Sequence, residues 1–275
     1  MGQCLITKLK GTVSNNTILK VGELRINFSA TGSSRKMQIR FTSDITLVCT
    51  SGFFTDESLS VKKGTTYTCK QDKIETIYVS NGSGYISCLN GKYKCSLINI
   101  SGSCYFIDTD YLKFDSDLLY VNLGNNRLST GDLSSLCLAK VTDIDVSKTN
   151  IYGDISAIAN CKNLNTASLY NSPNIKGDIA VFKNTPNLTS LVLGNAGIYG
   201  NIISFSSCLK LTTLNIPRTN LTGTVESLAN ALFTAGRNSG QIKLTCDNTY
   251  ITFNGQPCNF KIIKFSSTGV TYADS

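Results

Sequence analysis

The chain has 275 residues, of which 41% are hydrophobic and 16% are charged, and its formal net charge is +8. This length and apolar content suffice for one elongated domain or two modest ones, and the low charge excludes disorder by composition. Histidine is absent. Ser–His and Cys–His nucleophile pairs and imidazole metal sites are therefore excluded, and no glycine-rich phosphate loop follows a predicted strand.

Residues 1–73 are expected to form a small antiparallel β domain. Short apolar or alternating runs separated by Gly, Ser and Asn predict strands at residues 4–10, 18–28, 36–41, 45–49 and 59–61. The first run has no signal-peptide core, and no apolar run is long enough to span a membrane, so synthesis in a cytoplasm without membrane insertion is expected.

Basic residues gather toward the N-terminus. Residues 1–75 contain 11 Lys/Arg and 6 Asp/Glu. This excess favours an acidic partner for that end, although an ordinary solvated basic surface explains it as well. No basic run interleaves with aromatic residues, so nucleic acid is not an expected partner.

A repeat extends from about residue 74 to about residue 245. The pattern apolar-x-x-apolar-x-apolar ends at positions 123, 146, 169, 193 and 216, with spacings of 23, 23, 24 and 23 residues. Two weaker units precede it, at Cys95/Ile98/Ile100 and Ile74/Ile77/Val79, and Ile242/Leu244 follow it. Such a period predicts a solenoid of about 6–8 coils of about 23 residues, each with one parallel strand.

A second motif follows each strand. Asn150-Ile151-Tyr152-Gly153-Asp154-Ile155 is matched by residues 174–179, 197–202 and 220–225. The recurring glycine predicts a turn whose backbone angle a Cβ would obstruct. Short turns are therefore expected on the convex side of the solenoid, with the flanking apolar residues pointing inward.

These motifs resemble the leucine-rich-repeat family, in its variant with L-x-G-x-I after the strand. Residues 158–164 and 205–211 are similar to the F-x-x-C-x-x-L element of bacterial BspA-like repeats. The resemblance implies a leucine-rich-repeat solenoid. The chain departs from the family in lacking the proline that ends the L-x-G-x-I motif, and Thr149 and Thr219 replace the usual asparagine, which is clear only at Asn126.

The C-terminal end is expected to close the solenoid. Leu228, Leu232 and Phe233 have helical spacing within residues 226–233, and Gly236 is a suitable stop. Residues 246–275 then form a capping hairpin around residues 266–269. The expected domains are thus 1–73, 74–245 and 246–275.

The repeat register predicts which residues face outward on the concave side. Such a face can bind a glycan or a protein, or can simply be a soluble sheet. Asp143 and Asp145 lie side by side on one strand and lack the opposed geometry of a glycosidase pair, so no catalytic residue is expected. The candidate binding residues are Tyr120, Asn122, Asp143, Asp145, Lys148, Thr166, Ser168, Tyr170 and Arg218.

No metal or other cofactor is expected. Asp108, Asp110, Asp115 and Asp117 fit no known calcium loop, which favours a solvated turn. The 11 cysteines are scattered singly, which argues against zinc and against a disulfide framework. Cys161, Thr185 and Cys208 are expected to form a buried column of small residues, with the thiols reduced.

The opening of the chain carries a second resemblance. Residues 1–13 and 18–26 resemble the start of virion-associated proteins of tailed phages that infect gut Bacteroidales, the crAss-like group included. There, related N-terminal segments precede different C-terminal modules. The resemblance implies a non-enzymatic virion accessory protein, a head or tail decoration or fibre-like component. It would be made in the host cytoplasm and assembled with other virion proteins through residues 1–73. The solenoid would be displayed toward a host-surface glycan or protein. A bacterial BspA-like binding protein or adhesin is the alternative.

Overall fold

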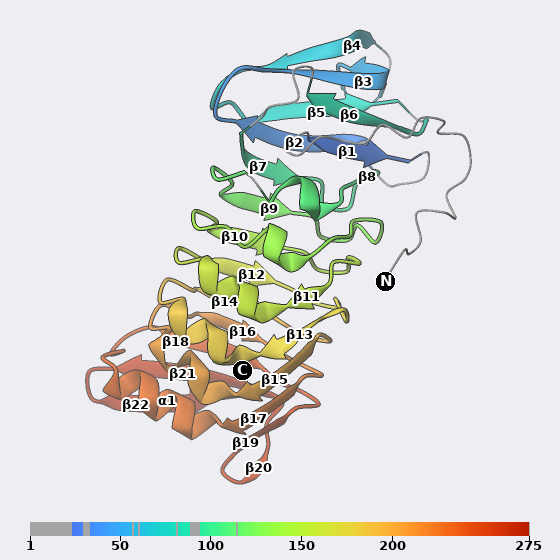
Figure 1. Cartoon of the computed structure of the whole chain (residues 1–275). Helices are drawn as coiled ribbons and strands as arrows, with labels where there is room; N and C mark the ends of the chain where they lie inside the picture. Colours follow the sequence, from blue (N-terminus) through green and yellow to red (C-terminus); the bar gives the residue numbers. More distant parts are fainter. Residues whose placement is uncertain are drawn as a thin grey trace.

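The computed structural model describes residues 24–29, 34–56, 58–59, 61–80, 82–88, 94–113 and 115–274. Within them lie a long sheet of 16 strands and a second sheet of six (Figure 1). The strand expected at residues 4–10, and most of the one expected at 18–28, lie outside the described residues. None of the helices in the described ranges has the length and apolar character needed to cross a bilayer.

The N-terminal part of the long sheet is antiparallel, as expected. Its strands are β1 (Arg25–Phe28), β2 (Lys36–Phe41), β3 (Ile45–Phe54), β4 (Lys62–Cys69), β5 (Glu75–Val79) and β6 (Gly84–Cys88). The strand predicted at 59–61 is wrong, because Leu59 has a φ of +56° in a turn and the strand begins at Lys62. This strand is mostly polar, so apolar alternation does not reveal it.

The weak repeat unit at Ile74/Ile77/Val79 is also wrong. These residues overlap β5, which pairs antiparallel with β2 and β3 rather than parallel with a coil. Ile77 and Val79 are buried, but Ile74 is 53% exposed. The spacing of Ile77 and Val79 suits the alternation of any half-buried strand, so it imitates the end of a repeat. The predicted domain boundaries remain a prediction, since the sheet continues unbroken from β2 into the next strand.

Parallel pairing begins at β7 (Cys95–Asn99), which lies against β2 on one side and β9 on the other. Each strand of this region pairs in register with the next, so that the middle residues Val121, Ile144, Ala167, Leu191 and Leu214 form one buried row. This confirms the register of the repeat. The strands are β9 (Tyr120–Asn122), β10 (Asp143–Asp145), β12 (Thr166–Ser168), β14 (Ser190–Val192), β16 (Thr213–Asn215) and β18 (Gln241–Thr245).

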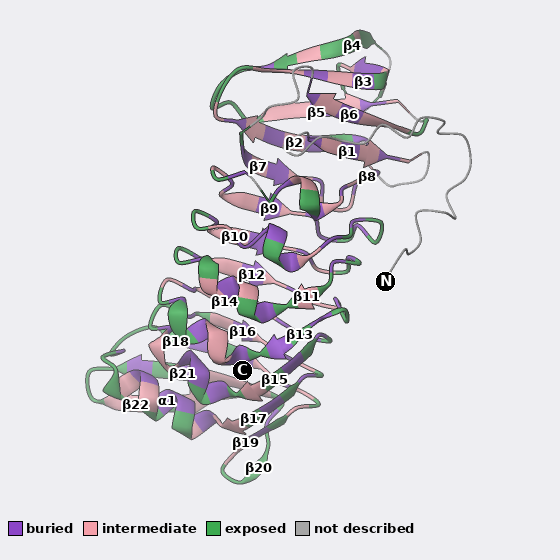
Figure 2. Cartoon of the chain, viewed as in Figure 1, coloured by how far each residue is buried: buried purple, intermediate pink, exposed green. Residues whose placement is uncertain are grey.

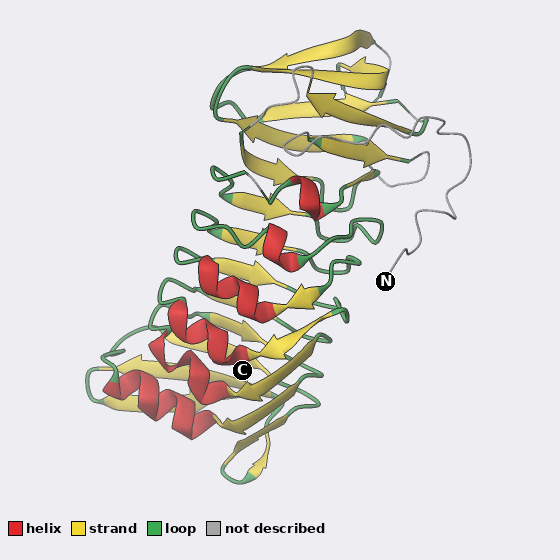
Figure 3. Ribbon diagram, in the orientation of Figure 1, coloured by secondary structure: helices red, strands yellow, loops and turns green. Residues whose placement is uncertain are grey.

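The convex side holds more than short turns. Short 3₁₀ helices lie along one side of the stack (Figure 3) at η2 (Thr109–Tyr111), η3 (Leu133–Ser135), η4 (Ile155–Asn160), η5 (Ile179–Asn184) and η6 (Ile202–Ser207). The second sheet contains β11 (Gly153–Asp154), β13 (Ile175–Asp178), β15 (Gly197–Asn201), β17 (Asn220–Thr224), β19 (Tyr250–Phe253) and β20 (Gln256–Pro257). The glycine motif alternates buried and exposed residues, the period of a strand, and therefore pairs with its copy in the next coil.

The core lies between the long sheet and the convex elements (Figure 2). Cys161, Thr185 and Cys208 are fully buried, which confirms the predicted column of small residues. Phe182 and Phe205 pack against each other between successive coils, with ring centroids 5.6 Å apart and ring planes tilted by 39°. Each coil thus buries its apolar residues against the next coil rather than within itself.

The C-terminal end is closed by a helix and a hairpin, as expected. Helix α1 (Val225–Thr234) begins where the Thr224 hydroxyl accepts the Ser227 N–H at 3.1 Å, and Gly236 follows it with a φ of +101°. Strand β21 (Phe260–Ser266) pairs antiparallel with β18 and with β22 (Gly269–Ala273). Where the N-terminal strands meet the first coil, β8 (Tyr105–Phe106) pairs antiparallel with β1.

Candidate functional site on the concave face

The side of the long sheet that turns away from the core is the concave face of the solenoid. On each parallel strand the first and third residues point to this side, while the middle residue is buried. The first positions, paired in register, are Leu97, Tyr120, Asp143, Thr166, Ser190, Thr213 and Lys243. The third positions are Asn99, Asn122, Asp145, Ser168, Val192, Asn215 and Thr245.

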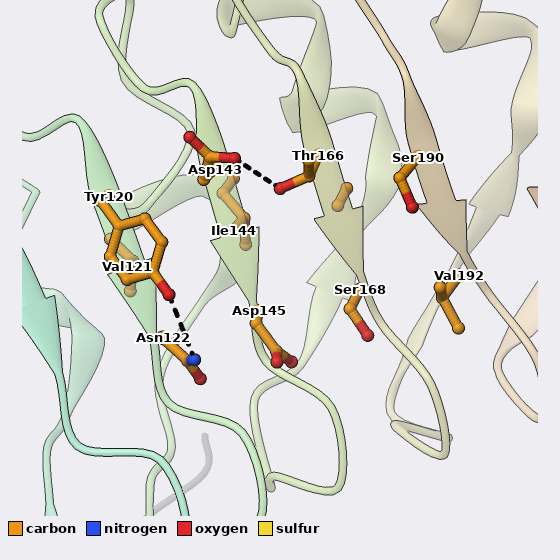
Figure 4. A pocket seen from close by; sticks show the side chains of 11 residues that line it. Tyr120, Val121, Asn122, Asp143, Ile144, Asp145, Thr166, Ser168, Ser190 and Val192 are labelled. Carbon is orange, nitrogen blue, oxygen red and sulfur yellow. Dashed lines mark hydrogen bonds between the residues drawn. The ribbon is translucent and has the colours of Figure 1, made fainter. Parts of the chain in front are cut away.

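A shallow open depression of about 180 Å³ lies on this face between β9 and β14 (Figure 4). Six of the nine predicted site residues line it: Tyr120, Asn122, Asp143, Asp145, Thr166 and Ser168. Ser190 and Val192 complete the outward-facing lining. Val121, Ile144 and Ala167 belong to the buried row beneath it. Its lining contains two carboxylates and no cation, so it is an acidic spot on a chain of net charge +8.

The two carboxylates are held in place by their neighbours. The Thr166 hydroxyl donates to Asp143 Oδ1 at 2.6 Å, and the Thr142 hydroxyl donates to Asp143 Oδ2 at 2.7 Å. Asp145 Oδ1 accepts both the backbone N–H of Ser147 at 2.9 Å and its hydroxyl at 2.6 Å. Both acids stay on one strand, side by side. This arrangement suits binding of a polar or cationic group rather than attack from opposite sides of a bond.

Tyr120 and Asn122 form the second fixed pair. The Asn122 amide donates to the Tyr120 hydroxyl at 3.3 Å, and Asn122 Oδ1 accepts the Gly124 N–H at 3.1 Å. Their strand neighbours are Asp143 and Asp145 respectively. A tyrosine fixed beside two carboxylates offers a partner a ring face and hydrogen-bond acceptors. Because these side chains are already ordered, they lose little conformational entropy on binding.

The other three predicted residues lie beyond the depression. Tyr170 is half-buried, two residues after β12, and Lys148 and Arg218 are exposed in the loops that follow β10 and β16. The Lys148 ammonium lies 6.0 Å from the centre of the Tyr170 ring. The predicted set therefore divides into a depression and a neighbouring loop rim.

A larger recess of about 550 Å³, which no sequence pattern predicted, lies near the junction of the N-terminal strands with the first coils. It is lined by Arg40, Thr42, Gln71, Asp72, Ser96, Asp117, Leu119 and Lys140. The Arg40 Nε–H donates to the Ser96 hydroxyl at 2.8 Å. The Lys140 ammonium lies 2.7 Å from Asp117 and holds the pKa of that carboxyl below its ordinary value. No repeat signal indicates this recess, because residues from both parts of the sheet meet there.

The solvated turn expected for the four aspartates of residues 108–117 is wrong for Asp115, which is buried. The Asp108 side chain accepts the Asp110 N–H at the start of η2. Asp115 Oδ2 accepts the Cys95 N–H at 2.6 Å, and burial raises the pKa of Asp115 to about 6. Across the described ranges, no group of three or more His, Cys, Asp or Glu residues could hold a metal ion.

The ten cysteines that the structure describes are buried and free of disulfide bonds. Cys4 lies outside the described residues. Burial raises the pKa of the Cys95 thiol well above its ordinary value, and it raises the pKa of Cys208 as well. A protonated, buried thiol is a poor nucleophile, so Cys95 and Cys208 act as small apolar residues.

Comparisons with known proteins give a likeness of structure. No protein-family model matches the chain, and no curated protein matches it. Among solved structures it resembles the leucine-rich-repeat ectodomain of a plant membrane receptor kinase from Arabidopsis thaliana in complex with Casparian strip integrity factor 2. That match has 18% identity, a TM-score of 0.46, and coverage of 60% of this chain and 19% of the receptor.

Two other solved structures are similar at the same level. One is a plant peptide hormone receptor in complex with its peptide, at 17% identity and a TM-score of 0.42, covering 53% of this chain and 23% of the receptor. The other is internalin C2 from Listeria monocytogenes, at 15% identity and a TM-score of 0.37, covering 59% of this chain and 74% of the internalin. The chain spans only about a fifth of the plant receptors' length. By its own 23-residue repeat and parallel strand register, the chain is a leucine-rich-repeat solenoid.

Proposed function

We propose that this chain is a non-enzymatic binding protein whose concave face holds a partner through the depression at Tyr120, Asn122, Asp143 and Asp145. The observation that carries the proposal is the preorganisation of this depression: each carboxylate and the tyrosine hydroxyl is already fixed by a neighbour. A binding role is further supported by the absence of histidine and by the placement of both acids on one strand.

Within that role, the chain is a phage virion accessory protein, a head or tail decoration or fibre-like component. The resemblance of residues 1–13 and 18–26 to virion-associated proteins of tailed phages supports this, as does the basic excess of residues 1–75. Docking to other virion proteins resides in residues 1–73, as part of an oligomeric assembly. The solenoid is displayed toward a host-surface glycan or protein.

The test follows an affinity-tagged full-length chain in Bacteroidales cells infected with a crAss-like phage. The chain should co-purify with particles, and salt should release it because the docking surface is basic. Replacing Lys62, Lys63 and Lys73 by Gln should lower incorporation. Replacing Lys162, Lys183 and Lys210 by Gln removes the same charge from the solenoid and should leave incorporation unchanged.

Two results would reverse the proposal. If the solenoid variant is lost from particles and the N-terminal variant is retained, docking resides in the solenoid instead. If the tagged chain is absent from particles and is found on the bacterial surface, the account of a BspA-like bacterial binding protein replaces the virion account.

A further inference from the structure

A column of left-handed residues borders the concave face. In six successive coils, the third residue after the last outward-facing residue of the strand has a positive φ. These residues are Asn125 (+61°), Lys148 (+55°), Asn171 (+55°), Asn195 (+63°), Arg218 (+53°) and Asn248 (+56°). A backbone ladder imposes this conformation. The Lys148 N–H donates to the Tyr170 carbonyl at 2.9 Å, and the Arg218 N–H donates to the Asp247 carbonyl at 2.9 Å.

Two members of this column are ill suited to their backbone. Asparagine tolerates the left-handed region because its short polar side chain hydrogen-bonds locally, and four of the six coils use it. Lys148 and Arg218 lack that compensation, yet the ladder holds them in the same conformation. Both exceptions are basic. Strain retained at particular positions points to a use for the side chains that occupy them.

Neither basic side chain has an acidic partner within the described ranges. Four ion pairs are found there, and none includes Lys148 or Arg218. The carboxylates of Asp145, in the turn that leads to Lys148, and of Asp247, whose backbone carbonyl accepts the Arg218 N–H, accept hydrogen bonds from residues of their own loops. Asp145 accepts from Ser147, and Asp247 accepts from the Asn248 amide at 3.4 Å. The two cations are therefore available to a carboxylate from outside the chain.

The spacing along the column defines what would fit. Lys148 and Arg218 are separated by three coils, or about 14 Å at the spacing of neighbouring strands. Asn171 and Asn195 lie between them, with the Asn195 amide donating to Asn171 Oδ1 at 2.9 Å. An extended peptide advances about 3.4 Å per residue, so acidic side chains four residues apart would span the same distance.

We infer that this rim, Lys148 through Arg218, binds an extended acidic segment of a partner protein lying along the solenoid axis. Lys148 and Arg218 each bind one carboxylate, and the two asparagines contact the segment between them. The inference rests on the proposed binding role of the concave face and adds the chemistry of one partner. At Lys148 and Arg218 the chain gives up some folding stability in order to present the two positive charges.

The experiment measures stability and binding on the same full-length variants: Lys148→Asn, Arg218→Asn and the double substitution. The probe is a fluorescein-labelled nine-residue Ser/Thr peptide with Glu at two positions four residues apart. Its matched control has Gln at both. Lys162→Asn combined with Lys183→Asn removes the same charge from exposed positions outside the column.

Each single rim variant should melt about 1–3 °C above the wild type, because asparagine relieves the strain. The double variant should bind the Glu peptide about tenfold more weakly, and the Lys162/Lys183 variant should bind it as the wild type does. The Gln peptide should not bind. Rim variants that melt at or below the wild-type temperature, or that bind the Glu peptide unchanged, overturn the inference.

Two further outcomes separate this inference from the proposed function. If a uronic-acid oligosaccharide displaces the Glu peptide and binds more tightly, the partner is an acidic glycan and the peptide assignment is wrong. If rim variants bind normally while variants of the depression lose host-surface binding, the proposed function stands and only this inference fails.

Discussion

Oδ1 of Asp178 lies 2.6 Å from the position that a Cβ would occupy on Gly200 in the next coil. Asp178 cannot withdraw freely, because its Oδ1 accepts the Ala180 N–H at 2.8 Å and starts η5. Gly200 also has a φ of +120°. The recurring glycine thus serves two purposes, the backbone angle and the close approach of the preceding coil's aspartate.

This relationship predicts the cost of Gly200→Ala. The substitution should destabilise the protein by about 1–2 kcal/mol through the backbone angle and by a further 1–3 kcal/mol, roughly, through the clash. Gly64→Ala is the matched control, because Gly64 has the same φ of +120° and nothing within 4 Å of its Cβ position. Urea unfolding should show the larger loss at Gly200. Equal losses would mean that the aspartate does not constrain the glycine.

The buried apolar column predicts that a substitution at Leu193 lowers the stability of the fold. Leu169, Leu193 and Ile216 are fully buried, and each follows a strand of the concave face. Leu193→Ala should cost about 2–5 kcal/mol because the rigid stack cannot close the cavity, and Leu193→Asp should unfold the solenoid. Leu209→Ala removes the same atoms from a side chain that is 38% exposed, and should cost much less. A Leu193→Asp variant with unchanged circular dichroism and melting would refute the register.

The cysteines are expected to be protected by the fold. Cys161 and Cys208 are fully buried, and burial raises the pKa of Cys208. Neither should be alkylated by iodoacetamide in the native state, and both should react in urea, as peptide mass spectrometry would show. Quantitative labelling of either residue without denaturant, or stoichiometric zinc in the purified protein, would contradict a structural role.

Asp115 predicts a pH dependence of opposite sign to that of a salt-bridged acid. Its pKa is raised from an unfolded value of about 3.9 to about 6 in the folded chain. Between pH 4 and 6 the unfolded state is therefore ionised while the folded state keeps its proton. The stability contributed by this group should fall as pH rises through that window. The contribution is flat below pH 4 and fully lost above pH 6.

This dependence is measured by comparing the free energy of unfolding of the wild type and Asp115→Asn from pH 3.5 to pH 7. The wild type should lose stability relative to the variant as pH increases between 4 and 6. A carboxyl ¹³C titration should place the Asp115 midpoint near 6. A midpoint below 4, or a stability difference independent of pH, would contradict a pKa of Asp115 that is raised by burial.

The strand register of the solenoid was predictable because a 23-residue period leaves only one way to stack apolar residues such as Leu169 and Leu193. The outward-facing residues of the parallel strands followed from the same register, which places Tyr120 beside Asp143. The second sheet was not foreseen, because its strands gain hydrogen bonds only from neighbouring coils. β4 was missed because it is polar, and β5 was misassigned because Ile77 and Val79 imitate the end of a repeat. The recess at Arg40 depends on contacts between distant residues that no local pattern records.

Binding of the full-length chain to the surface of Bacteroidales cells tests the central claim most directly. The concave variant combines Tyr120→Ala, Tyr170→Ala, Asp143→Asn and Asp145→Asn. The control combines Tyr152→Ala and Tyr199→Ala, which removes two exposed tyrosines outside the concave face, 47% and 51% exposed, one directly before β11 and one within β15. The concave variant, folded by circular dichroism, should bind at least tenfold more weakly than the wild type, and the control should bind normally. Equal binding by the concave variant and the wild type would show that the concave face is not the binding surface.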